Sequence, residues 1–407
     1  QRLADARENR APWRLWGPYL SERQWGTVRE DYSADGTAWE YLPHDHARSR
    51  AYRWGEDGIA GICDDQQQLC FALALWNGRD PILKERAFGL TGQQGNRGED
   101  VKEYYFYLDA TPSHSLLRYL YKYPQAEFPY GALLEENARR TRHDPPFNIL
   151  DTGAFDENRY FDVEVAYAKA SPNEIHIRIS VANRGPEAAE LHVLPTLWFR
   201  NTWSWRAGAI KPGICAVDAP AGAAWAVAVT HDDIGGYWLY GRERAELLFT
   251  GNETNDERLW GQANATPYVK DAFHRRVVEG AVDAVDPARL GTKFAGWSKC
   301  SLAPGESKRI DLVLSAQPIA SPFARSDAIF AAREAEADAF YRDLLPNGDA
   351  EDARIVRQAL AGMIWTKQFF HYDVERWLKG DLYPPPATRL RGRNAFDHCC
   401  QGAPGIG

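Results

Sequence analysis

The residues best suited to chemistry lie near the start of the chain, between Trp16 and Asp65. In this opening segment, WGPYLSERQWGTVREDYSADGTAWEYLPHDHARSRAYRWGEDGIAGICDD, Trp and Tyr alternate with Asp, Glu, Arg and His. Aromatic rings pack against the apolar faces of sugars, whereas carboxylates and guanidinium groups hydrogen-bond hydroxyls. The mixture is typical of a polar ligand site and indicates a carbohydrate. The candidate substrate-binding residues are Glu22, Trp25, Asp31, Trp39, Asp45, Arg48 and Trp54.

Paired carboxylates are the usual groups that cleave a glycosidic bond, and the opening segment holds several. They are Glu22, Glu30, Asp31, Asp35, Asp45, Glu56 and Asp57. The sequence does not show that any two of them face each other, so a surface ion pair is the alternative for each. The Trp residues have an alternative too, as large anchors in a core or between domains.

Three other motifs have simpler explanations than a bound ion or phosphate. His44 and His46 would share one face of a strand and could reach a metal, but no third ligand follows, and a polar turn after Pro43 is favoured. The cysteines lack zinc-type spacing. The glycines of GLTGQQGNRGED, from residue 89 to 100, match neither a P-loop nor GxGxxG, which favours a flexible loop that could close over a substrate. We predict no metal and no cofactor.

The composition is that of a globular protein with real cores. The chain has 407 residues, 44% of them hydrophobic, and its 48 basic and 56 acidic residues give a net charge of -8. Without a basic stripe, nucleic acid is not an expected partner. No apolar stretch has a bilayer-spanning length, and the six scattered cysteines fit reduced thiols, so we predict no membrane association and a cytoplasmic location. The first residue is Gln1 and the sole methionine is Met363, which suggests a piece of a longer protein.

Alternating apolar residues predict strands from about Ile59 to Ser315. RYFDVEVAYAK and EIHIRISVAN alternate with period two, LHVLPTLWFRN follows an NRGP turn, and Ile310, Leu312 and Leu314 alternate after APGES. Many strands separated by Gly, Pro and Asn clusters predict a large antiparallel β-sandwich.

Beyond Pro322 the period changes to that of helices. Residues 323–345 predict an Ala- and Glu-rich helix that crosses between domains, and residues 350–379 predict a second helix, ended by Gly380 and three prolines. The apolar stripe of the second helix lacks helical partners in this sequence. We therefore expect Ile355, Leu360, Met363 and Ile364 to form an exposed patch that favours self-association.

Several runs resemble bacterial glycoside hydrolase family 63-like glucosidases, relatives of mannosyl-oligosaccharide glucosidase and mannosylglycerate hydrolase. They are WGPYLSERQWGTVREDYS, HDHARSRAYRWGEDG, LALWNGRDPILKER, GNRGEDVKEYYFYLD, LYKYPQAEFPY, DTGAFDENRYFDVEVAYAKA, LPTLWFRNTWSW and RQALAGMIWTKQFFHYDVERWLKGD. The resemblance extends from about Leu15 to Asn394.

The resemblance implies a β super-sandwich over residues 1–320, a linker helix over 321–349, and over 350–394 the first helix of an (α/α)6 catalytic toroid. The final residues, 395–407, no longer resemble the family and suggest a truncated or frame-shifted reading frame. In the family both catalytic carboxylates lie on the toroid, so the resemblance assigns none here and leaves the opening segment as rim residues.

Two functions follow from the sequence. The first is the non-catalytic N-terminal part of an inverting glycoside hydrolase that acts on α-glucosides or mannosyl conjugates. The second is a self-standing carbohydrate-binding or scaffold β-sandwich. Both predict an oligosaccharide or glycoside as the partner.

Overall fold

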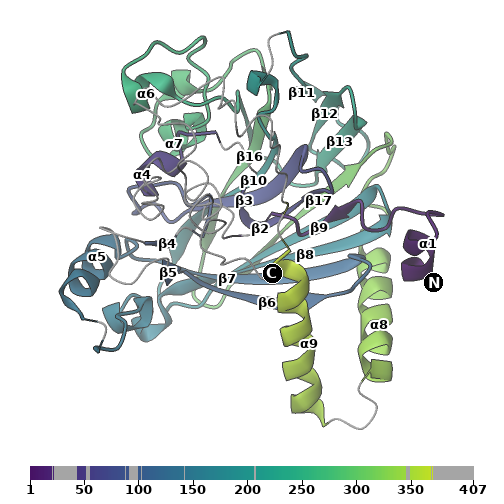
Figure 1. Ribbon diagram of the computed structural model, residues 1–407, viewed down its shortest axis with the longest axis horizontal. Helices are drawn as coiled ribbons and strands as arrows, with labels where there is room; N and C mark the ends of the chain where they lie inside the picture. Colours follow the sequence, from purple (N-terminus) through teal and green to yellow (C-terminus); the bar gives the residue numbers. More distant parts are fainter. Residues whose placement is uncertain are drawn as a thin grey trace, which may run out of the picture.

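Two antiparallel sheets stack face to face across one apolar core (Figure 1). The computed structural model describes residues 1–20, 22, 44–51, 56–87, 89–90, 100–101, 103–141, 143–205, 208–344, 349–367 and 369. This architecture is mainly β with helices added at the sides, which confirms the predicted β-sandwich.

The smaller sheet has six strands, with β10 among its central strands. In spatial order they are β1 (Trp16–Gly17), β2 (Ile59–Asp64), β3 (Leu69–Trp76), β10 (Ala189–Phe199), β16 (Lys293–Leu302) and β14 (Glu246–Thr250). All neighbours are antiparallel. From Leu191 to Phe199 every residue of β10 is buried, because both faces of this sheet are covered.

The larger sheet has nine strands and forms the other layer. In order they are β15 (Leu290–Gly291), β11 (Gly213–Val217), β12 (Trp225–His231), β13 (Gly235–Gly241), β17 (Ser307–Ser315), β9 (Glu174–Asn183), β8 (Tyr160–Ser171), β7 (Leu116–Pro124) and β6 (Tyr104–Ala110). A separate ladder joins β4 (Gly89–Leu90) to β5 (Asp100–Val101) at the ends of the glycine-rich loop, whose middle lies outside the described residues.

The predicted alternation fills the space between the sheets. Phe161, Val163, Val165 and Tyr167 on β8 are at most 1% exposed, as are the four apolar residues of β9 that alternate from Ile175. Cross-strand register places Val165 opposite Ile179. On β17 the alternating Ile310, Leu312 and Leu314 join the same cluster. Period two therefore predicted both the strands and their buried face correctly.

Short helices surround the sandwich. They are α1 (Arg2–Arg7), α4 (His44–Ala47), α5 (Tyr130–Arg139), α6 (Asp256–Trp260) and α7 (Ala272–Val277), with 3-10 turns at Ile149–Thr152, Asp156–Asn158, Trp203–Trp205 and Val282–Ala284. Helix α7 covers the outer face of the six-stranded sheet, where Phe273 and Val277 pack with Leu194 and Trp297.

Helix α8 (Ser326–Leu344) confirms the first predicted helix and lies on the outer face of the nine-stranded sheet. Its Phe330 and Ala337 pack on Leu116, Ala166 and Ala168. Its other side remains exposed, which agrees with the many Ala and Glu residues in its sequence.

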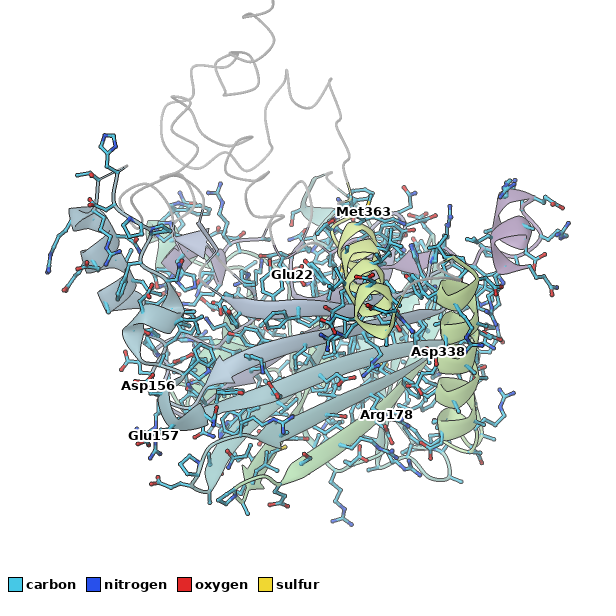
Figure 2. All side chains as sticks on the ribbon, turned by 90° about the horizontal axis from the view of Figure 1, so that it is seen from below. Glu22, Asp156, Glu157, Arg178, Asp338 and Met363 are labelled. Carbon is cyan, nitrogen blue, oxygen red and sulfur yellow. The ribbon has the colours of Figure 1, made fainter. Side chains whose placement is uncertain are left out.

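Helix α9 (Ala350–Trp365) follows α8 and packs against β6 (Figure 2). Its buried residues are Ala361 and Trp365. The Trp365 ring stacks on Tyr107 at 5.8 Å, lies 5.5 Å from Tyr119, and donates its Nε1 hydrogen to the backbone oxygen of Asp109 at 3.1 Å. Trp365 thus joins α9 to the apolar layer of the sandwich.

Two details of this helix differ from the prediction. It ends at Trp365, where the Thr366 hydroxyl bonds the Gly362 carbonyl, and residues 370–379 of the predicted helix lie outside the described residues. Ile364 packs against the main core instead of facing outward, whereas Ile355 and Met363 are 55% and 73% exposed. The exposed apolar surface is therefore smaller than the sequence stripe indicated.

In the part of the chain that the structure describes, each helix is too short or too polar to cross a lipid bilayer.

Candidate functional site

The opening segment does not form one surface cluster among the residues described. Trp25, Asp31, Trp39 and Trp54 lie outside the described residues. Glu22 is fully buried, which does not fit the rim position predicted for it. Asp45 and Arg48 are the remaining candidates with a described environment.

Glu22 lies in a cage of aromatic side chains beside α9 (Figure 2). The Tyr107 hydroxyl donates to its Oε2 at 2.8 Å. Burial raises the pKa of Glu22 to about 7, although the hydrogen bond from Tyr107 opposes the shift. Its other oxygen, Oε1, accepts no hydrogen bond from the described part of the chain. Glu22 is therefore a buried acid close to Trp365.

Asp45 and Arg48 form a surface ion-pair group, the alternative that the sequence left open. Asp45 lies 3.0 Å from Arg48 and 2.6 Å from Arg258 of α6. Despite the cost of partial burial, these cations lower the pKa of Asp45. The group fastens α4 to α6.

The HDH motif belongs to this same short helix, α4, and not to a strand. His44 lies against the Tyr130 ring, with 4.7 Å between centroids. Among the described residues, no three His, Cys, Asp or Glu side chains come together as a metal site. Cys63 and Cys70 face each other across β2 and β3 as buried free thiols.

The strongest concentration of buried charge lies on the outer face of the six-stranded sheet. There Ala72, Ala74, Thr196 and Trp198 provide a floor from β3 and β10. Glu56, Asp57, Glu85, Arg86, Asn252, Lys270 and Lys293 complete what we call the charged cavity. Every one of these seven polar residues is at most 8% exposed.

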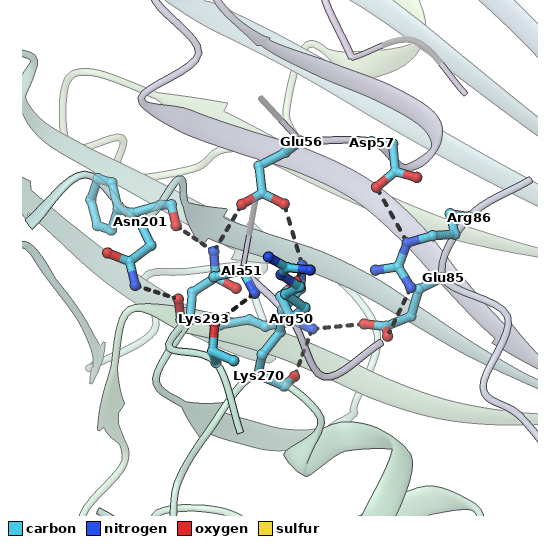
Figure 3. Close-up of polar contacts among 12 residues, drawn as sticks. Arg50, Ala51, Glu56, Asp57, Glu85, Arg86, Asn201, Lys270 and Lys293 are labelled. Carbon is cyan, nitrogen blue, oxygen red and sulfur yellow. Dashed lines mark hydrogen bonds and ion pairs between the residues drawn. The ribbon is translucent and has the colours of Figure 1, made fainter. Parts of the chain in front are cut away.

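Four ion pairs fix the walls of the charged cavity (Figure 3), and one of them joins Arg86 Nη1 to Glu85 Oε2 at 3.9 Å. Arg86 Nε lies 3.2 Å from Asp57, Lys293 lies 2.7 Å from Glu85, and Lys270 lies 3.6 Å from Glu56. Lys270 also donates to the backbone oxygen of Arg50 at 2.7 Å. Buried charges need such pairing, because an isolated one would be strongly destabilising.

The acids of the charged cavity have pKa values shifted in opposite directions: that of Glu85 is lowered, whereas those of Glu56 and Asp57 are raised. Burial raises the pKa of Glu85, but Lys293 and Arg86 outweigh it and bring the value to about 2. Burial prevails for Glu56 and Asp57, whose pKa values are raised despite Lys270 and Arg86. Burial also lowers the pKa of Lys270 to about 8.

Three buried oxygens of the charged cavity accept no hydrogen bond from the described residues. Within the described chain, Asp57 Oδ2, Glu85 Oε2 and Asn252 Oδ1 are buried and accept no hydrogen bond. The cavity has a volume of about 20 Å³, enough for a water molecule or a hydroxyl group but not for a sugar ring. A hydroxyl group would donate one hydrogen bond to these acceptors, and a water molecule would donate two.

The sequence indicated only part of this cavity. Glu56 and Asp57 were among the carboxylates of the opening segment. Glu85, Arg86, Asn252, Lys270 and Lys293 were missed, because no sequence spacing links residues that meet only in the folded structure. The signal that could have found them is an isolated charge inside an otherwise apolar stretch, as at Lys293 in TKFAGW.

Comparison with known proteins gives one relative by sequence. No family model matches the chain. A Saccharomyces cerevisiae protein described as uncharacterized protein YMR196W is 40% identical over 441 aligned positions, which cover 97% of this chain. The chain spans 40% of the length of that yeast protein.

Solved structures show weaker similarity. A polysaccharide lyase has a TM-score of 0.29 at 11% identity and covers 62% of this chain and 26% of its own. A protein described as a kojibiose phosphorylase from the human microbiome scores 0.27 at 9% identity, with 86% of this chain and 38% of its own covered. A galactose mutarotase related enzyme from Lactobacillus acidophilus has a TM-score of 0.24 at 8% identity. The match covers 66% of this chain and 97% of the enzyme. Scores of this size do not establish a common overall fold.

Proposed function

We propose that this chain is the sugar-contacting β-sandwich of a glycoside hydrolase family 63-like protein, and that it does not carry the hydrolytic carboxylates. Support for the family comes from the sequence runs and from the order of parts, a sandwich followed by two long helices. The ligand class we propose is an α-glucoside or a mannosyl conjugate.

The observation that carries this function is the set of unused acceptors in the charged cavity. Within the described chain, Asp57, Glu85 and Asn252 each keep a buried oxygen that accepts no hydrogen bond, and the Trp198 ring lines the same cavity. Sugars offer hydroxyl donors next to an apolar ring face, which complements this arrangement. Because the cavity holds only a hydroxyl-sized group, the ring itself would lie at the mouth.

The same geometry argues against hydrolysis in this cavity. Each carboxylate is paired with a cation that holds it in place. An inverting hydrolase needs an acid and a base about 6.5 to 9.5 Å apart, with a water and the glycosidic bond between them. A hydroxyl-sized cavity cannot hold that arrangement.

Asp57→Asn tests the proposal with little change in shape. The substitution replaces the buried acceptor Oδ2 with an amide, so we expect affinity for methyl α-glucoside or mannosylglycerate to fall about tenfold or more. Isothermal titration calorimetry on the purified chain measures it, with circular dichroism to verify folding.

The matched control is Asp156→Asn, since Asp156 is an exposed aspartate that does not line the charged cavity. It should bind as the wild type does. If neither sugar binds the wild-type chain, or if Asp57→Asn binds equally well, the proposed site is wrong. Release of free sugar above the blank would overturn the non-catalytic assignment.

A further inference from the structure

A second, much larger depression opens at one end of the sandwich. Its volume is about 690 Å³, within the usual range for ligand sites. Its lining comes from the turn between β2 and β3, from residues 200–203 and 209–212, from the turn between β12 and β13, and from Phe369. Its principal side chains are Gln66, Gln68, Trp203, Lys211, His231 and Asp233, which define the end groove.

The aromatic and cationic side of the end groove is held in a fixed orientation. Trp203 Nε1 donates to Glu253 Oε1 at 2.9 Å, and Lys211 lies 2.5 Å from the same oxygen. The Lys211 ammonium also lies 5.8 Å from the Trp203 ring centroid. An indole ring fixed at its edge presents a preorganised apolar surface, which lowers the entropic cost of binding.

The opposite side supplies neutral and acidic hydrogen-bonding groups. Gln68 Nε2 donates to Asp233 at 3.4 Å, while Gln68 Oε1 is buried and accepts no hydrogen bond within the described chain. Asp233 accepts through its side chain, and Gln66 lines the same groove as an exposed amide. Amides and carboxylates opposite an aromatic ring suit a ligand with many hydroxyls and no net charge.

The end groove lies next to the charged cavity. Trp198 of β10 lines the cavity, and Arg200, two residues after Trp198 and directly after the end of β10, lines the groove. Residues two apart on an extended strand lie on the same face, about 7 Å from each other. Asn252 lines the cavity, while its neighbour Glu253 holds Trp203 and Lys211 of the groove.

We propose that the end groove binds successive units of an oligosaccharide, while the charged cavity binds a hydroxyl of one terminal unit. This inference rests on the proposed function and specifies its ligand as a chain of sugars. The cavity is too small for a ring, whereas the groove is large enough for several and is open to solvent.

The test compares ligands of increasing length on the full chain. Calorimetric titration with glucose, maltose, maltotriose and maltotetraose should show affinity rising at least about tenfold from the monosaccharide to the tetrasaccharide. In Trp203→Ala that ratio should fall below about threefold, with glucose binding unchanged. Trp203→Phe keeps an aromatic face and should keep most of the length dependence.

Gln66→Ala is a second variant. Because the Gln66 side chain is exposed, its removal should not affect folding. Gln262→Ala is the matched control, since Gln262 is exposed as well. Gln66→Ala should weaken maltotetraose binding and leave glucose binding as it is, whereas Gln262→Ala should change neither. Equal affinity for all four sugars, or length dependence that survives both groove substitutions, overturns this inference alone. Absence of binding by every sugar overturns the proposed function together with it.

Discussion

Trp365→Ala should lower the free energy of unfolding by about 3 to 5 kcal/mol, the range measured for large aromatic residues removed from cores. Trp365 is fully buried, stacks on Tyr107 and donates a hydrogen bond to the Asp109 carbonyl. Its removal leaves a cavity at the edge of the sandwich and an unpaired carbonyl. Urea unfolding followed by circular dichroism measures the loss.

Met363→Ala is the control for this experiment, because Met363 lies on the same helix and is 73% exposed. Its effect should stay within about 0.5 kcal/mol. Trp365→Phe should fall between the two, since it keeps apolar contact and loses the hydrogen bond. A Trp365→Ala protein as stable as the Met363→Ala protein would show that α9 does not pack on β6 in solution.

Between pH 5 and pH 8, the free energy of unfolding of the wild-type chain should fall by about 3 kcal/mol more than that of the Glu22→Gln variant. The ordinary pKa of the Glu22 carboxyl is 4.5, and burial raises it to about 7 in the folded chain. A raised pKa means that the folded state holds its proton more tightly than the unfolded state does. The stabilisation is complete below pH 4.5 and is lost as the pH rises through 7. The difference between the two pKa values corresponds to about 3 kcal/mol.

Measuring the difference between the two proteins isolates Glu22 from the other buried acids, Glu56 and Asp57 among them. Urea midpoints and slopes at pH 5, 6, 7 and 8 give the free energies. Glu127→Gln is the control, because Glu127 is exposed and its substitution should leave the pH profile parallel to the wild type. Parallel profiles for Glu22→Gln as well would mean that Glu22 has an ordinary pKa.

The sequence predicted the sheets well because the pattern that reveals a strand is local. Alternation in RYFDVEVAYAK and EIHIRISVAN is visible in ten residues, and the same side chains fill the core. The amphipathic stripes likewise predicted α8 and the start of α9. The end of α9 was overestimated, because helical periodicity continues past Trp365 in the sequence whereas the chain turns there, so that Phe369 bonds the Tyr19 carbonyl.

The site could not be predicted in the same way, because its residues meet through pairing between distant strands. Glu85 reaches Lys293 because its neighbour Lys84 bridges to Leu75 of β3, and β3 and β16 both flank β10. Glu22 illustrates a second limit: a lone carboxylate in a polar stretch favours a surface position, but here the chain inserts it between Tyr107 and Tyr119. Composition identifies which groups are present in a segment, and only tertiary packing decides which of them are desolvated.

The order of strands in the six-stranded sheet also affects how quickly the chain can fold. Strand β10 begins at Ala189 and pairs with two strands that are distant in the sequence. One is β3, which ends at Trp76, and the other is β16, which begins at Lys293. Such pairing has high contact order, since long loops must close before the contacts that stabilise them exist. On the ribosome, β2 and β3 remain without their neighbour while more than half of the chain is still to be synthesised. Their apolar edge is then open to intermolecular pairing, so the β2–β3 hairpin is prone to aggregation until β10 is made.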